Sequence, residues 1–145
     1  MFFRSIENVH EKWGVPARFI ATLLAHDLKH LEGQYPKQPD FRYEQIAGLL
    51  EFLVQHQIDP ALAKRMLPHL WQHPKMDYES ILITIDFRKI SREDILAKLP
   101  FLVKKYRETR TSRDDNAGRR WIMGNLNKLA TGNLPLSELN QHIQI

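Results

Sequence analysis

Two histidines four residues apart are the most enzyme-like feature of the sequence. Residues 26–30 read HDLKH. Histidines at this spacing share one face of a helix, which is the geometry with which HExxH motifs bind zinc. Asp27 stands where that motif has glutamate, its side chain is one methylene shorter, and no third ligand can be named. The sequence therefore favours the alternative, in which His26 and His30 lie on the polar flank of a helix whose opposite face is core.

No other pattern indicates catalysis. His69 and His73 are also four apart, but Pro68 beside them leaves their relative geometry open. The sequence has no glycine-rich phosphate loop and no recognisable Ser-His-acid or paired-carboxylate spacing. It has no cysteine, which excludes disulfides and thiolate metal sites. We therefore expect no catalysis by this chain alone, and no cofactor or metal.

Positive charge is concentrated in residues 88–120. This segment holds eleven Lys or Arg and five acidic residues, although the whole chain has a net charge of only +4. Such a segment can bind phosphates, because the release of counterions supplies affinity without sequence recognition, and folded RNA is recognised largely by its backbone shape. The alternative is a solvated helix face balanced by nearby acids. The basic residues are Arg88, Lys89, Arg92, Lys98, Lys104, Lys105, Arg107, Arg110, Arg113, Arg119 and Arg120.

Helices are expected to position these side chains. Apolar residues recur at spacings of three and four along most of the chain, and period-two alternation is almost absent, so the predicted class is all-α. The clearest unit is 117–143, in which a basic amphipathic helix ends before Gly132 and Pro135 opens a short apolar helix. A further short amphipathic helix is predicted over 2–13.

Capping residues and prolines indicate where the other helices begin and end. Asp59 before Pro60 and Ser91 before an acidic turn are start signals. Asp77 is a candidate cap for 78–85, although a strand remains open there because the segment is rich in β-branched residues. Pro68 is expected to bend or end its helix, and Pro100 to split the helix that follows residue 91.

A proline-rich stretch over 33–40 is the predicted domain boundary. It divides the chain into a helical segment of residues 1–38 and a second domain of residues 41–145. No apolar run approaches the roughly 20 residues that a membrane-spanning helix needs, and the N-terminal residues do not resemble a secretory signal. We therefore expect a cytoplasmic protein with no membrane partner.

Four stretches resemble the GatB/YqeY family, the C-terminal tail of the GatB subunit, or of its archaeal counterpart, in the tRNA-dependent amidotransferases. They are Val15-Pro16-Ala17, the run IAGLLEFLVQHQIDPALAKRMLPHLW over 46–71, Ile90-Ser91, and MGNLNKLATGN over 123–133 followed by Pro135. Gly124 and Gly132 stand eight apart, as in the closing helix and turn of the family. The resemblance covers residues 14–143.

This resemblance implies a small helical domain followed by a YqeY-like tail of two helical subdomains. In the family, the tail contacts the outer corner of tRNA and helps select the tRNA that is amidated, while catalysis occurs in a separate cradle that is absent here. Similar tails occur on some bacterial glutaminyl-tRNA synthetases. The implied partners are tRNA and the catalytic cradle or other amidotransferase subunits.

The RNA-binding residues implied by the resemblance are limited, because the turn at Thr131-Gly132-Asn133 lacks the lysines common in the family. They are Arg119, Arg120 and Lys128, extended to Lys104, Lys105, Arg107, Arg110 and Arg113. The alternative function is a protein-interaction module in which Phe2, Phe3 and Trp13 dock on a partner subunit.

Overall fold

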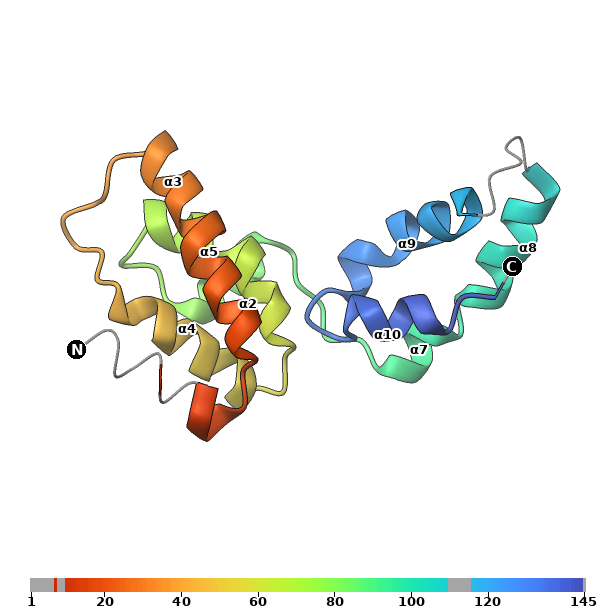
Figure 1. Cartoon of the computed structure of the whole chain (residues 1–145), viewed down its shortest axis with the longest axis horizontal. Helices are drawn as coiled ribbons and strands as arrows, with labels where there is room; N and C mark the ends of the chain where they lie inside the picture. Colours follow the sequence, from red (N-terminus) through yellow and green to blue (C-terminus); the bar gives the residue numbers. More distant parts are fainter. Residues whose placement is uncertain (1–6, 8–9, 110–115, 145) are drawn as a thin grey trace. The chain divides into compact units, whose positions relative to one another are not determined.

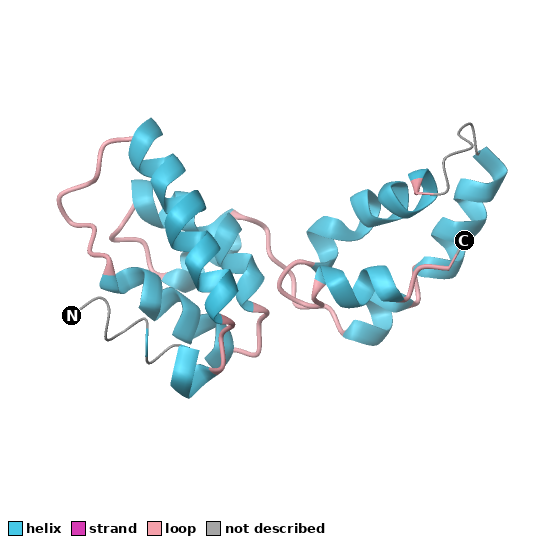
Figure 2. Ribbon diagram, viewed as in Figure 1, coloured by secondary structure: helices cyan, strands magenta, loops and turns pink. Residues whose placement is uncertain are grey.

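The computed structural model describes residues 7, 10–109 and 116–144, and all regular secondary structure within these residues is helical (Figure 1 and Figure 2). The prediction of an all-α chain is therefore confirmed. The chain divides into two compact units, residues 1–87 and residues 88–145. Each unit has its own apolar core.

After helical residues 10–13, the described part of unit 1 contains an interrupted long helix followed by three further α-helices. The long helix occupies residues 17–34, and its middle third is a π-helical turn rather than α-helix. A short 3₁₀ turn precedes the second of the three further helices. The elements are α2 (Ala17–Thr22), the π turn η1 (Leu23–Leu28), α3 (Lys29–Gln34), α4 (Glu44–Gln55), the 3₁₀ turn η2 (Pro60–Leu62), α5 (Ala63–Gln72) and α6 (Tyr78–Thr84).

The predicted start signals of unit 1 are confirmed. Asp59 accepts a hydrogen bond from the backbone N–H of Ala61 at 3.0 Å, and Asp77 accepts one from Ser80 at 2.7 Å. Hydrogen bonds from Ser80 also hold the pKa of the Asp77 carboxyl below its usual value. Because Asp77 caps α6, the alternative of a strand after residue 77 is excluded. Pro68 does not end its helix, since α5 continues through it to Gln72.

The core of unit 1 includes residues from both sides of the predicted boundary. Leu23 and Leu31 precede the proline-rich stretch, whereas Phe41 and Trp71 follow it, and all four are buried in one cluster. The rings of Phe41 and Trp71 lie 4.8 Å apart, and Trp71 Nε1 donates to the carbonyl of Tyr35 at 3.3 Å. Residues 33–40 therefore connect two parts of one core. The compact units divide after residue 87, not between residues 38 and 41 as the prolines suggest.

Tyr78 makes a close contact between α4 and α6. Its hydroxyl donates to the backbone carbonyl of Gln45 at 2.8 Å. A Cβ at Gly48 would lie 2.6 Å from the same hydroxyl, so α4 needs a glycine here. Burial, with a contribution from the negative charge of Glu51, raises the pKa of Tyr78 to about 12.

Unit 2 is organised around α9. Its elements are α7 (Arg92–Leu96), α8 (Leu99–Thr109), α9 (Ala117–Ala130) and α10 (Leu136–Gln141), and α9 contacts each of the other three. Ile95, Leu126 and Leu139 bring α7, α9 and α10 into the core. Figure 1 shows α10 folding back beside α9.

Most boundary predictions for unit 2 are confirmed. Ser91 accepts a hydrogen bond from the Asp94 backbone N–H at 3.1 Å and caps α7. A second helix begins just before Pro100, which therefore lies in the first turn of α8, where its missing N–H costs nothing. Gly132 follows α9 with φ of 92°, the left-handed geometry expected for a residue that ends a helix.

Asn133 connects the start of unit 2 to the turn after α9. Its side-chain amide donates to the carbonyls of Arg88 at 2.8 Å and Leu129 at 2.9 Å. Its Oδ1 accepts from the backbone N–H of Ile90 at 2.9 Å. One side chain therefore holds the first residues of unit 2 against the end of its central helix.

Candidate nucleic-acid interface

The exposed side of α8 carries the strongest candidate for a binding surface. Leu99 and Tyr106 are buried, which turns the opposite side of α8 toward solvent. Lys104, Lys105 and Glu108 lie on that side, whereas Arg107 lies toward a flank of the helix, because residues two apart do not face each other; all four are exposed. We call the cations Lys104, Lys105 and Arg107, together with Phe101, the α8 surface.

The cations of the α8 surface are available to a ligand. Within the described residues, the side chains of Lys104, Lys105 and Arg107 make no hydrogen bond or ion pair. A cation that has no internal partner retains its full charge for an external anion such as a phosphate. The charge predicted for this stretch is therefore exposed and unneutralised by contacts within the described chain.

Phe101 adds an aromatic side chain to these cations. It lies four residues before Lys105, so both share one face of α8, and it is 66% exposed. Exposed aromatic rings beside lysines or arginines form the platforms on which unpaired bases stack in single-stranded nucleic acids. Phe101 is not among the residues predicted from the sequence, although its position outside the apolar stripe of Leu99, Leu102 and Tyr106 indicates an exposed ring.

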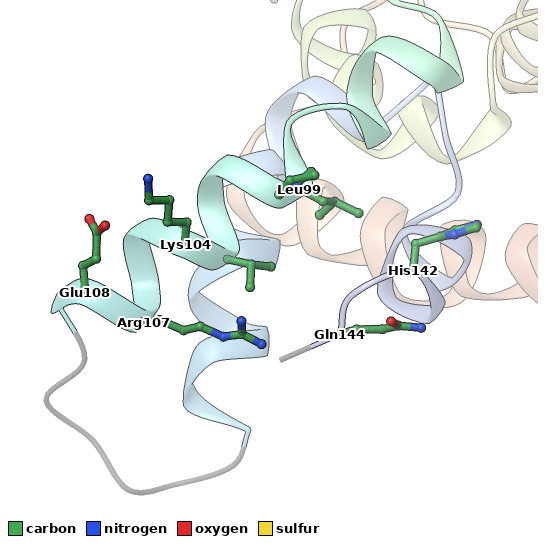
Figure 3. Close-up of a pocket in the computed structure, with 8 residues that line it drawn as sticks. Leu99, Lys104, Arg107, Glu108, His142 and Gln144 are labelled. Carbon is green, nitrogen blue, oxygen red and sulfur yellow. The ribbon is translucent and has the colours of Figure 1, made fainter.

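An open groove of about 520 Å³ lies along α8 within unit 2. Figure 3 shows Arg107 reaching from α8 toward the side where Gln144 lies, with Lys104 and Glu108 on another side of the helix. Among the described residues that line the groove, Glu108 is the single acid. The groove is lined by Leu99, Pro100, Val103, Lys104, Arg107, Glu108, His142 and Gln144.

His142 and Gln144 were not among the predicted site residues. They follow α10 and lie more than thirty residues from α8 in the sequence, and only the fold brings them to the groove. No helical spacing connects them to Lys104 or Arg107. Their place in the groove could not be inferred without the packing of α10 on α9.

Arg119 has an intramolecular role. Its Nη1 donates to the Asn140 carbonyl at 2.6 Å and to Asn140 Oδ1 at 3.1 Å, and its Nη2 donates to the Ile143 carbonyl at 3.2 Å. The guanidinium therefore joins the first turn of α9 to the end of α10. The sequence analysis assigns Arg119 to RNA binding, but a change of its charge would break these contacts within unit 2.

The remaining predicted cations that the structure describes already have interactions of their own. Arg92 pairs with Glu138 and lies 3.1 Å from His142 Nε2, so its charge is partly satisfied within unit 2. Arg120 and Lys128 are exposed on α9 and have interactions of their own. Arg110 and Arg113 lie outside the described residues.

Unlike Phe101, the other aromatic residues of α8 and α9 are withdrawn from solvent. Tyr106 is 9% exposed, and its ring lies 6.0 Å from that of Trp121. Trp121 packs against the core of unit 2. Trp13, which the alternative function would place on a partner, packs against the core of unit 1, and Phe2 and Phe3 lie outside the described residues.

The candidate metal sites lack support from the geometry. Within the described residues, no three His, Asp or Glu side chains are arranged to hold a metal ion. His69 and His73 do not share a helical face, because α5 ends at Gln72 and His73 has a non-helical φ of −133°.

None of the described helices has both the length and the apolar character of a membrane span.

Comparisons with known proteins returned no match. No family model, no curated protein and no solved structure matches this chain. The resemblance to the GatB/YqeY family therefore depends on the four stretches quoted above, and the candidate interface on its own chemistry.

Proposed function

We propose that the chain is a non-catalytic tRNA-binding module, the tail of a tRNA-dependent amidotransferase or of a related glutaminyl-tRNA synthetase. The observation that carries the proposal is the α8 surface, where three exposed cations lie on the same helix as an exposed phenylalanine. Phosphates need exposed cations, and unpaired bases need exposed rings. The corner of a tRNA presents both, because its backbone is compact and its loops contain unpaired nucleotides.

The resemblance directs this surface toward tRNA in particular. It implies that the module itself performs no chemistry and that a catalytic cradle or partner subunit acts on the bound tRNA. The helical fold and the left-handed turn at Gly132 agree with what that resemblance leads us to expect. Arg120 and Lys128 on α9 remain proposed secondary contacts.

Binding of total tRNA to the full chain, measured by fluorescence anisotropy at two salt concentrations, tests the proposal. We expect the triple variant Lys104→Gln, Lys105→Gln, Arg107→Gln to bind more weakly. The slope of log K against log salt should fall by about 0.9 for each lost phosphate contact, hence by about 3 at most. Removal of the ring by Phe101→Ala should weaken binding roughly 5- to 150-fold, equivalent to about 1–3 kcal/mol of base stacking.

Two controls separate the α8 surface from general effects. The variant Arg18→Gln, Lys29→Gln, Lys37→Gln removes the same charge from exposed positions of unit 1 and should leave affinity nearly unchanged. Ile83→Ala removes another exposed apolar side chain, 79% exposed in unit 1, and should have no effect. Equal binding by the parent and the α8 triple variant, or equal losses in the two triple variants, would overturn the assignment.

A further inference from the structure

The groove of unit 2 lies on a different face of α8 from the exposed ring of Phe101. The helix contributes Pro100, Val103, Lys104 and Arg107 to the lining (Figure 3). These residues stand three or four positions apart, so they share one face of α8. Phe101 is not part of the lining. The groove is therefore a second binding surface of α8, and it shares two cations with the first.

The floor of this groove is aliphatic. Leu99 lies beneath it and is 7% exposed, whereas Pro100 is exposed and Val103 is half-buried. Pro100 and Val103 therefore keep apolar surface in contact with water, and a ligand that covers this surface is favoured. The groove volume of about 520 Å³ lies within the range of roughly 300–1,000 Å³ found for small-molecule sites. The space is thus suited to a group of the size of one nucleotide.

His142 contributes a hydrogen-bond donor to the groove. Its Nε2 lies 3.1 Å from Arg92 Nη2, and because a guanidinium can only donate, this Nε2 accepts. The proton of the neutral ring is therefore on Nδ1, which makes no hydrogen bond within the described residues. Arg92 is itself held by an ion pair with Glu138. The tautomer of His142 is thus fixed, and its Nδ1–H is available to an oxygen of a ligand.

The polar groups of the lining favour an anion. Lys104 and Arg107 have no partner within the described residues, and Glu108 is the single acid among the described residues of the lining. Ammonium and guanidinium groups form strong charge-assisted hydrogen bonds with phosphate. The side-chain amide of Gln144, also without a hydrogen bond in the described chain, carries both donors and an acceptor. A glutamine amide can therefore bind two edge atoms of a base such as adenine.

We propose that this groove holds one unpaired nucleotide of the bound RNA. The phosphate pairs with the two cations of the lining, and His142 Nδ1 donates to an oxygen of the sugar-phosphate. The base covers Pro100 and Val103, and Gln144 binds its edge. Neighbouring bases cover both faces of a base within a duplex, so only an unstacked nucleotide can lie in the groove. The inference rests on the proposed function, which brings RNA to α8, and it adds a site that selects a looped-out nucleotide.

Titration of the full ¹⁵N-labelled chain, followed by amide chemical shifts, tests the proposal with three probes. Adenosine 5′-monophosphate (AMP) carries the base and the phosphate, ribose 5-phosphate lacks the base, and adenosine lacks the phosphate. We expect AMP to cause saturable shifts at residues 99–108 and 142–144. It should bind at least about tenfold more tightly than either fragment, equivalent to 1.4 kcal/mol, because only AMP makes both kinds of contact.

Substitutions in the groove separate the contact with the phosphate from the contact with the base. Lys104→Gln should lower the affinity for AMP and for ribose 5-phosphate alike. Lys98→Gln removes the same charge from an exposed position just before α8, outside the groove lining, and should leave both affinities unchanged. Pro100→Ser removes exposed apolar surface and should lower the affinity for AMP alone. The dispersion of the amide spectrum reports whether each variant is folded.

Three results would overturn the proposal. They are the absence of saturable shifts with AMP, binding of either fragment as tight as that of AMP, and equal effects of Lys104→Gln and Lys98→Gln. None of them contradicts the proposed function, because tRNA can bind through its phosphates and the exposed ring of Phe101 without filling the groove. If instead the parent chain does not bind tRNA, the proposed function is wrong, whereas selective binding of AMP would still support a nucleotide site in the groove.

Discussion

The hydroxyl of Tyr78 occupies the space that any side chain at residue 48 would need. The separation of 2.6 Å between this oxygen and a Cβ at Gly48 is shorter than real contacts allow. The hydroxyl cannot move without losing its 2.8 Å hydrogen bond to the Gln45 carbonyl. The next atoms of the ring lie at 3.6 and 3.8 Å, which is ordinary contact.

Gly48→Ala should therefore destabilise the protein despite the helix preference of alanine. Overpacking costs about 1–3 kcal/mol, which exceeds or balances the gain of about 1 kcal/mol from replacing a helical glycine. In the background of Tyr78→Phe, the clashing oxygen is absent and the same substitution should be neutral or stabilising. Urea denaturation of the four proteins of this cycle gives the comparison, and an equal effect of Gly48→Ala in both backgrounds would contradict the contact.

Tyr78 should also make stability depend on pH at the alkaline end. Its pKa is raised from 10.0 to about 12 in the folded chain. Between these values the unfolded chain loses the phenolic proton while the folded chain keeps it, which favours unfolding. The free energy of unfolding is therefore unaffected by this group below pH 10 and falls as the pH rises from 10 toward 12. Denaturation midpoints of the parent and of Tyr78→Phe should converge over this range, whereas parallel curves would show that the phenol titrates normally.

Residue-level features could be predicted from the sequence where they are local. Asp59, Asp77 and Ser91 cap the helices that follow them, because a cap depends only on residues two or three positions away. The role of Arg119 could not be predicted in this way. Its acceptors on Asn140 and Ile143 are more than twenty residues away, and only the packing of α10 on α9 brings them together.

At the scale of elements, Arg119 acts as a clamp between two helices. It forms three hydrogen bonds. Two of them go to backbone carbonyls, that of Asn140 in the last turn of α10 and that of Ile143 just after it. The last carbonyls of a helix lack donors within the helix, so a cation at this position supplies them.

Arg119→Ala should lower the free energy of unfolding by roughly 2 kcal/mol, since hydrogen bonds that involve a charged group contribute about 1.5–3 kcal/mol. Arg107→Ala is the matched control, because this exposed arginine of the same unit makes no such bonds within the described chain and its loss should change stability little. Asn140→Ala removes only the Oδ1 acceptor and should cost less than Arg119→Ala. Equal stability of the two arginine variants in urea denaturation would show that the clamp contributes nothing.

The irregular parts of the helices were the least predictable elements. The apolar spacing of residues 20–31 predicts one helix, and one helix forms, but nothing in that spacing announces the π turn of residues 23–28. The rule that Pro68 bends or ends a helix weighs only the lost hydrogen bond and the clash. In the structure, burial of Leu67, Leu70 and Trp71 on both sides of Pro68 outweighs that local cost, and α5 continues.

At the scale of the whole molecule, helical class followed from periodicity, whereas the division into units did not. Residues 33–40 are rich in proline. Such a stretch indicates that no helix runs through it, but it does not indicate that a separate core lies on each side. The apolar faces before and after this stretch bury one another. The division between the two compact units, after Phe87, is not marked by a nearby proline or glycine in the sequence. The groove of unit 2 was missed for a related reason, since its two sides come from distant parts of the chain.

Each of the two cores is built from a single uninterrupted stretch of chain, and this has a consequence for biosynthesis. Residues 1–87 contain every side chain that their core needs, so this unit can complete its folding as soon as it clears the ribosome. Translation of the remaining stretch takes roughly 3–12 s at 5–20 residues per second. Helical units with short-range contacts fold in microseconds to milliseconds. The first unit can therefore be native before the segment that carries α8 has left the ribosome.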